Sequence, residues 1–248
     1  MAKERHVRIA AVADLHIEPG RGSIAGVLAE AAREADVLAL CGDLTNQGTA
    51  EQYEALARDL ETVKVPIVAV FGNHDHEGEI TEEATALLER VGVRVLDGDS
   101  VVIDGVGFAG VKGFAGGFGR GTLAPFGERL IKDFVQHAID EALKLENALR
   151  RLDTETKIVL MHYSPIVETL EGEPEQIYPF LGSSRLLAPI ETYGADAVFH
   201  GHAHSGAHEG QTPSGIPVYN VSLPVLQRVG KKYHIHRARA PERRRRAS

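Results

Sequence analysis

The sequence of 248 residues has one cysteine and no tryptophan, and these shortages already exclude several classes of protein. The single cysteine, Cys41, rules out an internal disulfide framework and any metal site built from several thiolates. No apolar run reaches the roughly 18 residues that a membrane-spanning helix needs. The first apolar run is broken by Asp14 and does not look like a signal peptide. We therefore expect a cytoplasmic protein.

Basic residues are scarce too, except near the end of the sequence. The chain has 27 basic and 35 acidic residues, a formal net charge of −8, and six of its arginines stand in residues 237–248. The preceding part is therefore strongly acidic, which argues against binding nucleic acid by general charge attraction. We expect residues 237–248 to form a disordered Arg-rich tail, with no specific nucleic-acid or membrane partner. The oligomeric state stays open.

Apolar runs and helical periodicities alternate along the chain, which predicts an α/β fold in a single domain over residues 1–236. The early part predicts strands at 7–13, 37–41 and 67–71 and helices at 24–34, 49–63 and 79–91. The later part predicts strands at 93–96, 100–103, 107–111, 157–161 and 197–200, helices at 128–152 and 184–192, a hairpin at 206–211 and 217–221, and a last strand at 232–236.

Polar side chains recur where five of these apolar strands end. They are Asp14 and His16, Asp43, Asn73 with His74 and Asp75, His162, and His202 with His204. Imidazole, carboxylate and amide oxygen are ligands that suit Mn, Fe or Zn. Two such ions about 3.5–4 Å apart can clamp a phosphorus centre during in-line displacement. Each motif alone is weak, but their joint occurrence at strand ends predicts a metal site.

This set of motifs resembles the signature of the calcineurin-like metallophosphoesterase superfamily, over residues 7–236. The resemblance implies a two-sheet β-sandwich flanked by helices, a four-layer αββα fold, with a centre of two metal ions, Mn, Fe or Zn. Carried over position by position, the first ion would be held by Asp14, His16 and His204. The second would be held by Asn73, His162 and His202, and Asp43 would bridge the two.

His74 is similar to a histidine of that family that binds no metal. The hypothesis is that a metal-bridging hydroxide attacks phosphorus in line while His74 acts as the general acid for the leaving oxygen. Asp75, its neighbour in sequence, is the candidate for orienting His74. The two metal ions would attract phosphate although the protein around them is acidic.

The residues around Asp43 narrow the choice of substrate. Gly42-Asp43-Leu44-Thr45 lacks the Val-Asp-Arg-Gly that follows this Gly-Asp in phosphoprotein phosphatases of the eukaryotic type. It is more similar to bacterial class III cyclic-nucleotide phosphodiesterases. We therefore expect a hydrolase acting on a small phosphodiester, such as a cyclic nucleotide, or on a phosphomonoester. The alternatives are a non-catalytic metal-binding scaffold, a phosphoprotein phosphatase and a redox protein with two metal ions.

Other features have plainer interpretations. Residues 105–110 match G-x-G-x-x-G, but they follow a turn signal between short strands and predict a hairpin rather than a dinucleotide site. The loops at 112–127 and 163–180 are either surface loops or segments that set specificity, such as a lid carrying Arg120. We expect His76 at the rim of the site and a structural role for His200. His208, His234 and His236 are expected at the surface rather than in a second metal site.

Overall fold

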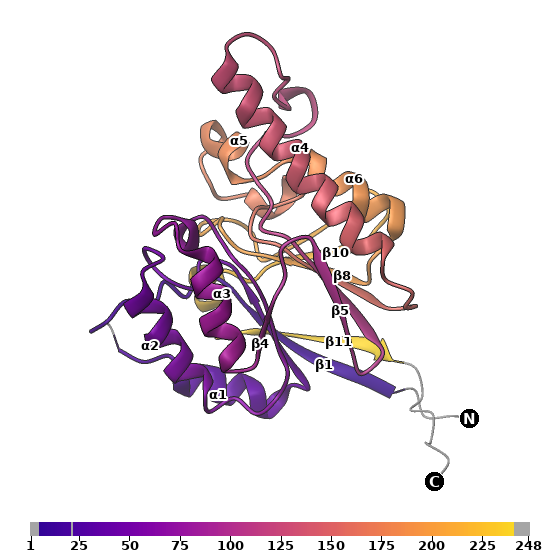
Figure 1. The fold of residues 1–248 in the computed structure, drawn as a ribbon. Helices are drawn as coiled ribbons and strands as arrows, with labels where there is room; N and C mark the ends of the chain where they lie inside the picture. The colour runs from indigo at the N-terminus through magenta and orange to yellow at the C-terminus, as the bar shows by residue number, and fades with distance from the viewer. Residues whose placement is uncertain (1–4, 21, 241–248) are drawn as a thin grey trace.

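Two β-sheets lie at the centre of the molecule in this computed structural model, which describes residues 5–20 and 22–240 (Figure 1). The first sheet has the strand order β11-β1-β2-β3-β4 and the second β5-β6-β7-β8-β10-β9. The strands are β1 (Arg5–Val12), β2 (Val37–Cys41), β3 (Ile67–Val70), β4 (Val93–Val95), β5 (Asp99–Ile103), β6 (Val106–Gly110), β7 (Lys157–Leu160), β8 (Ala197–His200), β9 (Glu209–Gln211), β10 (Pro217–Asn220) and β11 (His234–Ala240). Strands β1 to β4 run parallel to one another, as do β6, β7, β8 and β10.

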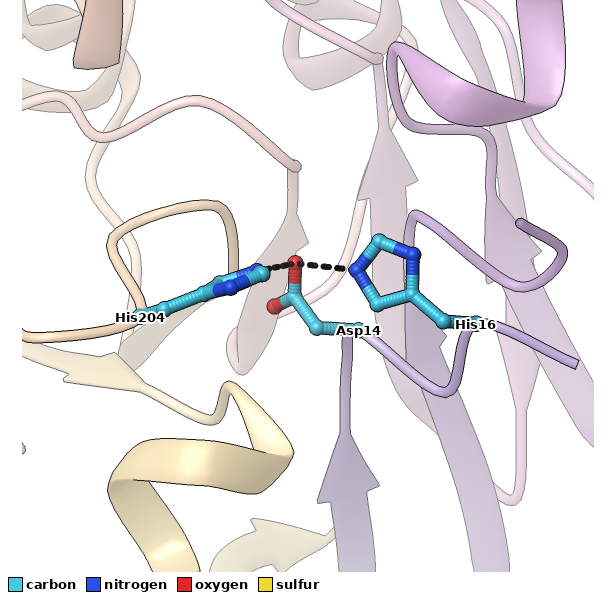
Figure 2. Close-up of side chains that lie close together, drawn as sticks. All are labelled: Asp14, His16 and His204. Atoms are coloured by element: carbon cyan, nitrogen blue, oxygen red, sulfur yellow. Dashed lines mark hydrogen bonds and ion pairs between the residues drawn. The ribbon is translucent and has the colours of Figure 1, made fainter. Parts of the chain in front are cut away.

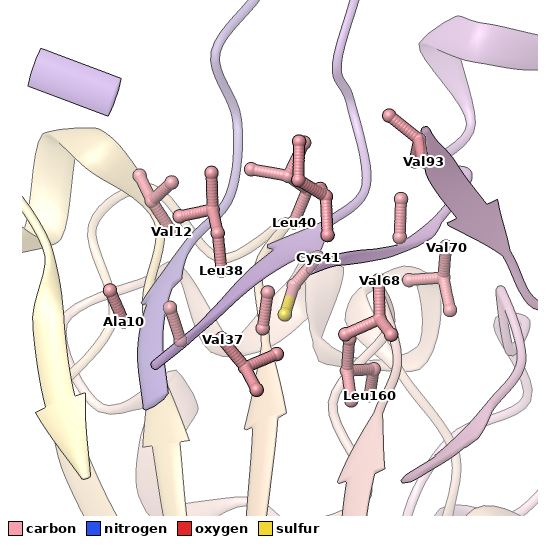
Figure 3. Packing of buried hydrophobic residues seen from close by; sticks show 14 of the residues in the cluster. Ala10, Val12, Val37, Leu38, Leu40, Cys41, Val68, Val70, Val93 and Leu160 are labelled. Carbon is pink, nitrogen blue, oxygen red and sulfur yellow. The ribbon is translucent and has the colours of Figure 1, made fainter. Parts of the chain in front are cut away.

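The inner strands are apolar on both faces because each sheet is covered on both sides. In β7, Ile158 and Leu160 join the core between the two sheets, whereas Val159 belongs to a second core under the helices. This division follows from the period of two along a strand. Leu160 lies next to Val68 of β3 in Figure 3, on the side of the first sheet that faces the second.

Helices cover the outer faces of the sandwich. The helices of the first half, α1 (Ala25–Glu34), α2 (Ala50–Leu60) and α3 (Thr81–Arg90), lie together against the first sheet, and α4 (Arg129–Arg150) and α6 (Ser184–Tyr193) cover the second (Figure 1). Thr49 begins α2 as the sequence predicts, because its hydroxyl accepts a hydrogen bond from the Gln52 amide. The predicted four-layer αββα sandwich is confirmed.

The hairpin expected at residues 105–110 is also present. Strands β5 and β6 pair antiparallel, and the turn between them has Asp104 and Gly105 at positive φ. The G-x-G-x-x-G match therefore lies in a turn and a strand and does not lead into a helix. Short helices that the sequence did not predict are α5 (Tyr178–Leu181), α7 (Leu223–Arg228) and the 3-10 turns His74–His76, Gly119–Gly121, Glu168–Leu170 and Glu175–Ile177.

The last strand is longer than the sequence predicts. Strand β11 continues to Ala240 and pairs with β1 in an antiparallel register that joins Ala240 to Arg5. The tail predicted from residue 237 is therefore wrong for residues 237–240, where the arginines alternate with the buried residues Ala238 and Ala240. Residues 241–248 lie outside the described part of the chain. Within residues 5–20 and 22–240, no helix has both the length and the apolar character needed to cross a bilayer.

Candidate metal centre

The polar residues predicted at five strand ends come together at one edge of the sandwich. Strands β1, β2 and β3 supply them from the first sheet, and β7 and β8 supply them from the second. There are three groups of side chains, and within each group the ligand atoms lie within 4.8 Å of one another. The groups include all of the predicted ligands except Asn73. The groups are Asp14, His16 and His204; His16, Asp43 and His74; and Asp43, His162 and His202.

The backbone is strained where it delivers these side chains. Asp14, His16, Asp43 and His202 all have positive φ, between 44° and 70°. Residues other than glycine rarely adopt this conformation, and each instance costs of order 1 kcal/mol or more. Only two other non-glycine residues share it in the described parts of the chain, Glu79 and Asp104. Strain thus concentrates at the cluster, as it does at functional sites.

Two glycines let the chain pass close to the buried carboxylates. A Cβ atom at Gly72 would overlap the Asp43 carboxylate, and one at Gly201 would overlap the Asp14 carboxylate. The glycines that precede Asn73 and His202 are therefore needed for space rather than for their φ angles. This explains why the motifs of Asn73 and His202 begin with glycine.

Asp14 lies between two histidines, as Figure 2 shows. Its Oδ1 atom is 2.8 Å from His204 Nε2 and 3.9 Å from His16 Nε2. The carboxylate also accepts a hydrogen bond from the His202 backbone amide. The hydrogen bond to Asp14 raises the pKa of His204, and burial only partly opposes it.

His16 provides the test of whether these residues fit a metal ion. Both of its ring nitrogens are buried and have no hydrogen-bond partner. Its Nε2 atom lies 3.9 Å from Asp14 Oδ1 and 3.8 Å from Asp43 Oδ2, too far for hydrogen bonds. Two ligands at about 2.1 Å from one ion lie roughly 3–3.5 Å apart. The spacing is close to that of ligands around a shared ion, so the donor set fits metal binding.

The second group surrounds His162, which is fully buried. His162 Nδ1 donates to the Cys41 carbonyl at 3.1 Å, and this leaves Nε2 facing Asn73 Oδ1 at 3.0 Å and Asp43 Oδ1 at 3.3 Å. A histidine that binds a metal commonly uses its other ring nitrogen in this way. Burial opposes protonation, but Asp43 and Asp14 raise the pKa of His162 to about 9.

Asp43 and His202 complete this group. Burial alone would raise the pKa of Asp43, but His162 and the His74 amide bring it well below its usual range. His202 Nε2 lies 3.2 Å from the Phe180 carbonyl, and burial lowers the pKa of His202 to about 3. The imidazole of His202 is therefore neutral, the form that binds metal ions.

His74 lies at the open side of the cluster. Its Nδ1 atom is 2.7 Å from the Asn46 carbonyl, which can only accept, so Nδ1 carries a proton. Its Nε2 atom is 4.0 Å from Asp43 Oδ2, and the ring is 4.7 Å from that of His16. The group that orients His74 is thus a backbone carbonyl, for which the sequence offers no signal.

The prediction that Asp75 orients His74 is wrong. Asp75 is fully buried and accepts hydrogen bonds from the amides of Leu44, Thr45 and Gly72 and from the Thr45 hydroxyl. Consecutive residues of a 3-10 turn point about 120° apart, so the two side chains separate. Asp75 therefore ties the loop after β2 to the loop after β3. Burial, followed by Asp43, raises the pKa of Asp75.

Sequence reasoning missed Lys112, which also lies at a strand end. It follows β6 by two residues, and its carbonyl accepts the amide of His162 at 3.0 Å. An apolar run ending in a charged residue is the same signal that identified the other strand ends. The predicted lid residue Arg120 is exposed, whereas Phe114 and Tyr163 from the two candidate loops line a cavity beside Asn73.

The predictions for the remaining histidines are partly confirmed and partly wrong. His200 is fully buried, with its ring nitrogens 2.8 Å from Thr169 Oγ1 and from the Gly201 carbonyl, which confirms its structural role. His76 is exposed and lines the cavities beside the cluster, in line with a rim position. The surface position expected for His234 is wrong, because His234 is buried against Tyr219 at a ring separation of 4.1 Å.

Known proteins similar to this chain point to one family. The family model of calcineurin-like phosphoesterases matches residues 7–206. A protein of Moraxella catarrhalis named probable cyclic nucleotide phosphodiesterase is 44% identical over 45 residues, which cover 18% of this chain and 16% of that protein. This chain therefore aligns with only a small part of that relative's length.

Solved structures share the fold at low sequence identity. Phosphopantetheinyl hydrolase from Mycobacterium tuberculosis is 11% identical, with a TM-score of 0.67 and coverage of 99% of both chains. The protein TT1561 of Thermus thermophilus is 19% identical, with a TM-score of 0.56 and coverage of 94% of this chain and 99% of that one. These likenesses concern the fold alone.

Proposed function

This chain belongs to the calcineurin-like phosphoesterase family and is a metal-dependent phosphoesterase, and from this premise we propose that it hydrolyses a small phosphodiester. The observation that carries the proposal is the cluster itself. Two buried carboxylates, Asp14 and Asp43, lie 3.8–3.9 Å from Nε2 of His16, and neither ring nitrogen of His16 has a hydrogen-bond partner. A preference for phosphodiesters, cyclic nucleotides included, is supported by the short match to a probable cyclic nucleotide phosphodiesterase.

We assign the ligands in two sets that share Asp43. Asp14, His16 and His204 would hold one divalent ion, and Asn73, His162 and His202 would hold a second. Mn, Fe and Zn suit this mixture of imidazole, carboxylate and amide oxygen. When bound, such ions neutralise phosphate oxygens and make water a stronger nucleophile at neutral pH.

His74 is the residue of this chain best placed to move a proton. Because its Nδ1–H is held by the Asn46 carbonyl, the proton that it exchanges is the one on Nε2, at the open side of the cluster. In the proposed reaction, Nε2–H is donated to the leaving alkoxide, and the ring stays in place as a neutral imidazole. The fixed Nδ1–H bond holds the ring orientation throughout.

The motif that suggested a cyclic-nucleotide substrate also has a structural role. Thr45 donates to Asp75 through its amide and its hydroxyl, and the Gly48 amide donates to Thr45 Oγ1. A Cβ at Gly48 would also overlap the Asp75 carbonyl. Thr45 and Gly48 therefore hold the loop that carries Asp43.

The deciding experiment compares substrates on protein of known metal content. Protein loaded with Mn, Fe or Zn is assayed with bis(4-nitrophenyl) phosphate and 4-nitrophenyl phosphate, then with 3′,5′- and 2′,3′-cyclic nucleotides. We expect the diester to be hydrolysed faster than the monoester. Hydrolysis of the monoester alone would favour a phosphatase, and no hydrolysis with two metals bound would favour a non-catalytic scaffold.

A further inference from the structure

A cavity of about 250 Å³ opens beside the candidate metal centre. Asn73, one of the assigned ligands, forms part of its wall, together with Lys112, Phe114 and Tyr163. A larger cavity of about 600 Å³ shares Lys112 and His76 with the first and extends toward α3. The space next to the metal centre is therefore large enough for a substituent on the phosphate, and not only for the phosphate itself.

The backbone of Lys112 is fixed to the loop that carries His162. The Lys112 carbonyl accepts hydrogen bonds from the amides of His162, at 3.0 Å, and Tyr163, at 3.2 Å. The side chain is also held: the residue is only 9% exposed, and Nζ donates to the Gly113 carbonyl at 2.8 Å. An ammonium group is thus placed in a defined position relative to the metal ligands.

The ammonium group of Lys112 is not paired with a neighbouring carboxylate. In residues 5–20 and 22–240, no carboxylate forms an ion pair with it. Glu141, on the same wall, accepts from Lys144 Nζ at 2.9 Å and from the Gly113 amide at 2.9 Å. Asp97 also pairs with Lys144, at 3.0 Å. The two acidic groups of the cavity are therefore already engaged with Lys144.

What Lys112 does face is two aromatic rings. Its Nζ atom is 4.9 Å from the centroid of Phe114 and 5.2 Å from that of Tyr163. Cation–π contacts stabilise a buried ammonium only partly, and Lys112 keeps donors beyond the one given to Gly113. A buried cation with free donors, next to aromatic surface, is suited to an anionic group attached to an apolar or planar body.

We propose that this cavity binds the part of the substrate that does not react, and that Lys112 recognises a second negative charge there. The substrate class is then a phosphodiester that carries a further phosphate or carboxylate on a planar or apolar substituent. This inference rests on the proposed phosphodiesterase function. Lys112 is in this view a specificity residue, and its ammonium does not act on the bond that breaks.

The test uses three diesters with the same 4-nitrophenolate leaving group. Their second substituent is phenyl, 3-carboxyphenyl or 3-phosphonophenyl, so the latter two add the charge in carboxylate or phosphonate form. In metal-loaded wild type we expect kcat/KM for at least one charged ester to exceed that for the phenyl ester by about tenfold, as one charge-assisted hydrogen bond would give. The better of the two charged esters identifies the anion.

Three variants separate recognition from other effects. Lys112→Met should remove the preference for charged esters, so that kcat/KM becomes similar for all three esters. Lys112→Arg should keep part of it, because the charge remains. Lys132→Met, which removes an exposed lysine of α4, should leave all three values unchanged. Melting temperatures and metal contents verify that each variant is folded and loaded.

The outcomes that overturn the inference differ from those that overturn the proposed function. If wild type cleaves the phenyl ester but shows no preference for charge, the inference fails and the phosphodiesterase proposal stands. If Lys112→Met lowers all three values equally, Lys112 does not read the second charge, and the inference fails too. If loaded wild type cleaves none of the esters, the proposed function itself fails.

Discussion

Two groups of histidines in this molecule show how differently the same side chain behaves. At the candidate metal centre, Asp14 and Asp43 are surrounded by five histidines: His16, His74, His162, His202 and His204. Where β10 approaches β11, His234 packs against Tyr219 and Phe199, and His208 Nε2 lies 3.2 Å from Lys231 Nζ. Only the first group contains buried carboxylates.

The consequence appears in the pKa values of the buried histidines. Burial, followed by His208 and Lys231, lowers the pKa of His234 to about 3. Burial acts on His162 in the same direction, but Asp43 and Asp14 reverse it and raise the pKa to about 9. Burial alone therefore does not decide the pKa of a histidine: the carboxylates beside His162 outweigh it, whereas at His202 burial prevails and the pKa falls to about 3. Four substitutions test this contrast, in decreasing order of expected effect.

Removing the shared carboxylate should have the largest effect. Asp43→Asn leaves an amide between His16 and His162, so we expect loss of bound metal and a fall in kcat of roughly 10³-fold or more. Metal analysis and turnover of bis(4-nitrophenyl) phosphate measure it. The matched control is Glu209→Gln, whose exposed carboxylate is 3.6 Å from His208 Nε2 in the other group and should not matter. Full metal content in Asp43→Asn would contradict the assignment.

Removing the proposed proton donor should lower activity without removing metal. His74→Ala deletes the ring at the open side, and we expect kcat to fall about 10²- to 10³-fold, the usual contribution of a general acid. His6→Ala, at an exposed position of β1, provides the control. Turnover close to wild type with intact metal content would mean that His74 transfers no proton.

Asp75→Asn should affect stability more than chemistry. The new amide nitrogen would face the backbone donors of Leu44, Thr45 and Gly72, so we expect a loss of about 2–4 kcal/mol in the free energy of unfolding. Chemical denaturation measures it, with the exposed Asp153→Asn as control. If Asp75 instead acted through His74, kcat would fall and stability would not change.

The smallest effect is expected at His234 and depends on pH. Its pKa is about 3 in the folded protein against an ordinary value of 6.5, so the unfolded chain binds the proton more readily. Stability is therefore lost as pH falls from 6.5 toward 3, by about 1–2 kcal/mol at pH 4.5 after allowing for partial burial. His234→Phe should make acid unfolding shallower, and the exposed His6→Phe should not. Parallel curves for wild type and His234→Phe would show that His234 titrates normally.

The sequence predicts the fold well because its strands are apolar runs and its helices are amphipathic. The choice of Asp14, Asp43 and the strand-end histidines follows from the same logic, since parallel strands deliver their ends to one edge. The boundary at residue 237 failed because β11 pairs an alternating Arg-Ala segment with β1. In such an edge strand the arginines carry the charge while the alanines face the core.

Contacts through the backbone were beyond prediction from residue types. Asn46 holds His74 with its carbonyl, and any residue could offer a carbonyl at that position. Asp75 turns away from His74 because of the local 3-10 geometry, which neighbours in sequence cannot reveal. Lys112 was not predicted because it stands at the start of a glycine-rich segment. That composition is typical of a loop and hides the strand end.

The pairing of β1 with β11 has a consequence for the order of events during synthesis. On the nascent chain, β1 keeps an open edge until His234–Ala240 have left the ribosome, and open strand edges invite association with other chains. Asp14 likewise meets His204 only after 190 further residues have been made. The proposed ligands are therefore complete only late in synthesis, and chains released early would lack both the finished sheet and a complete binding site.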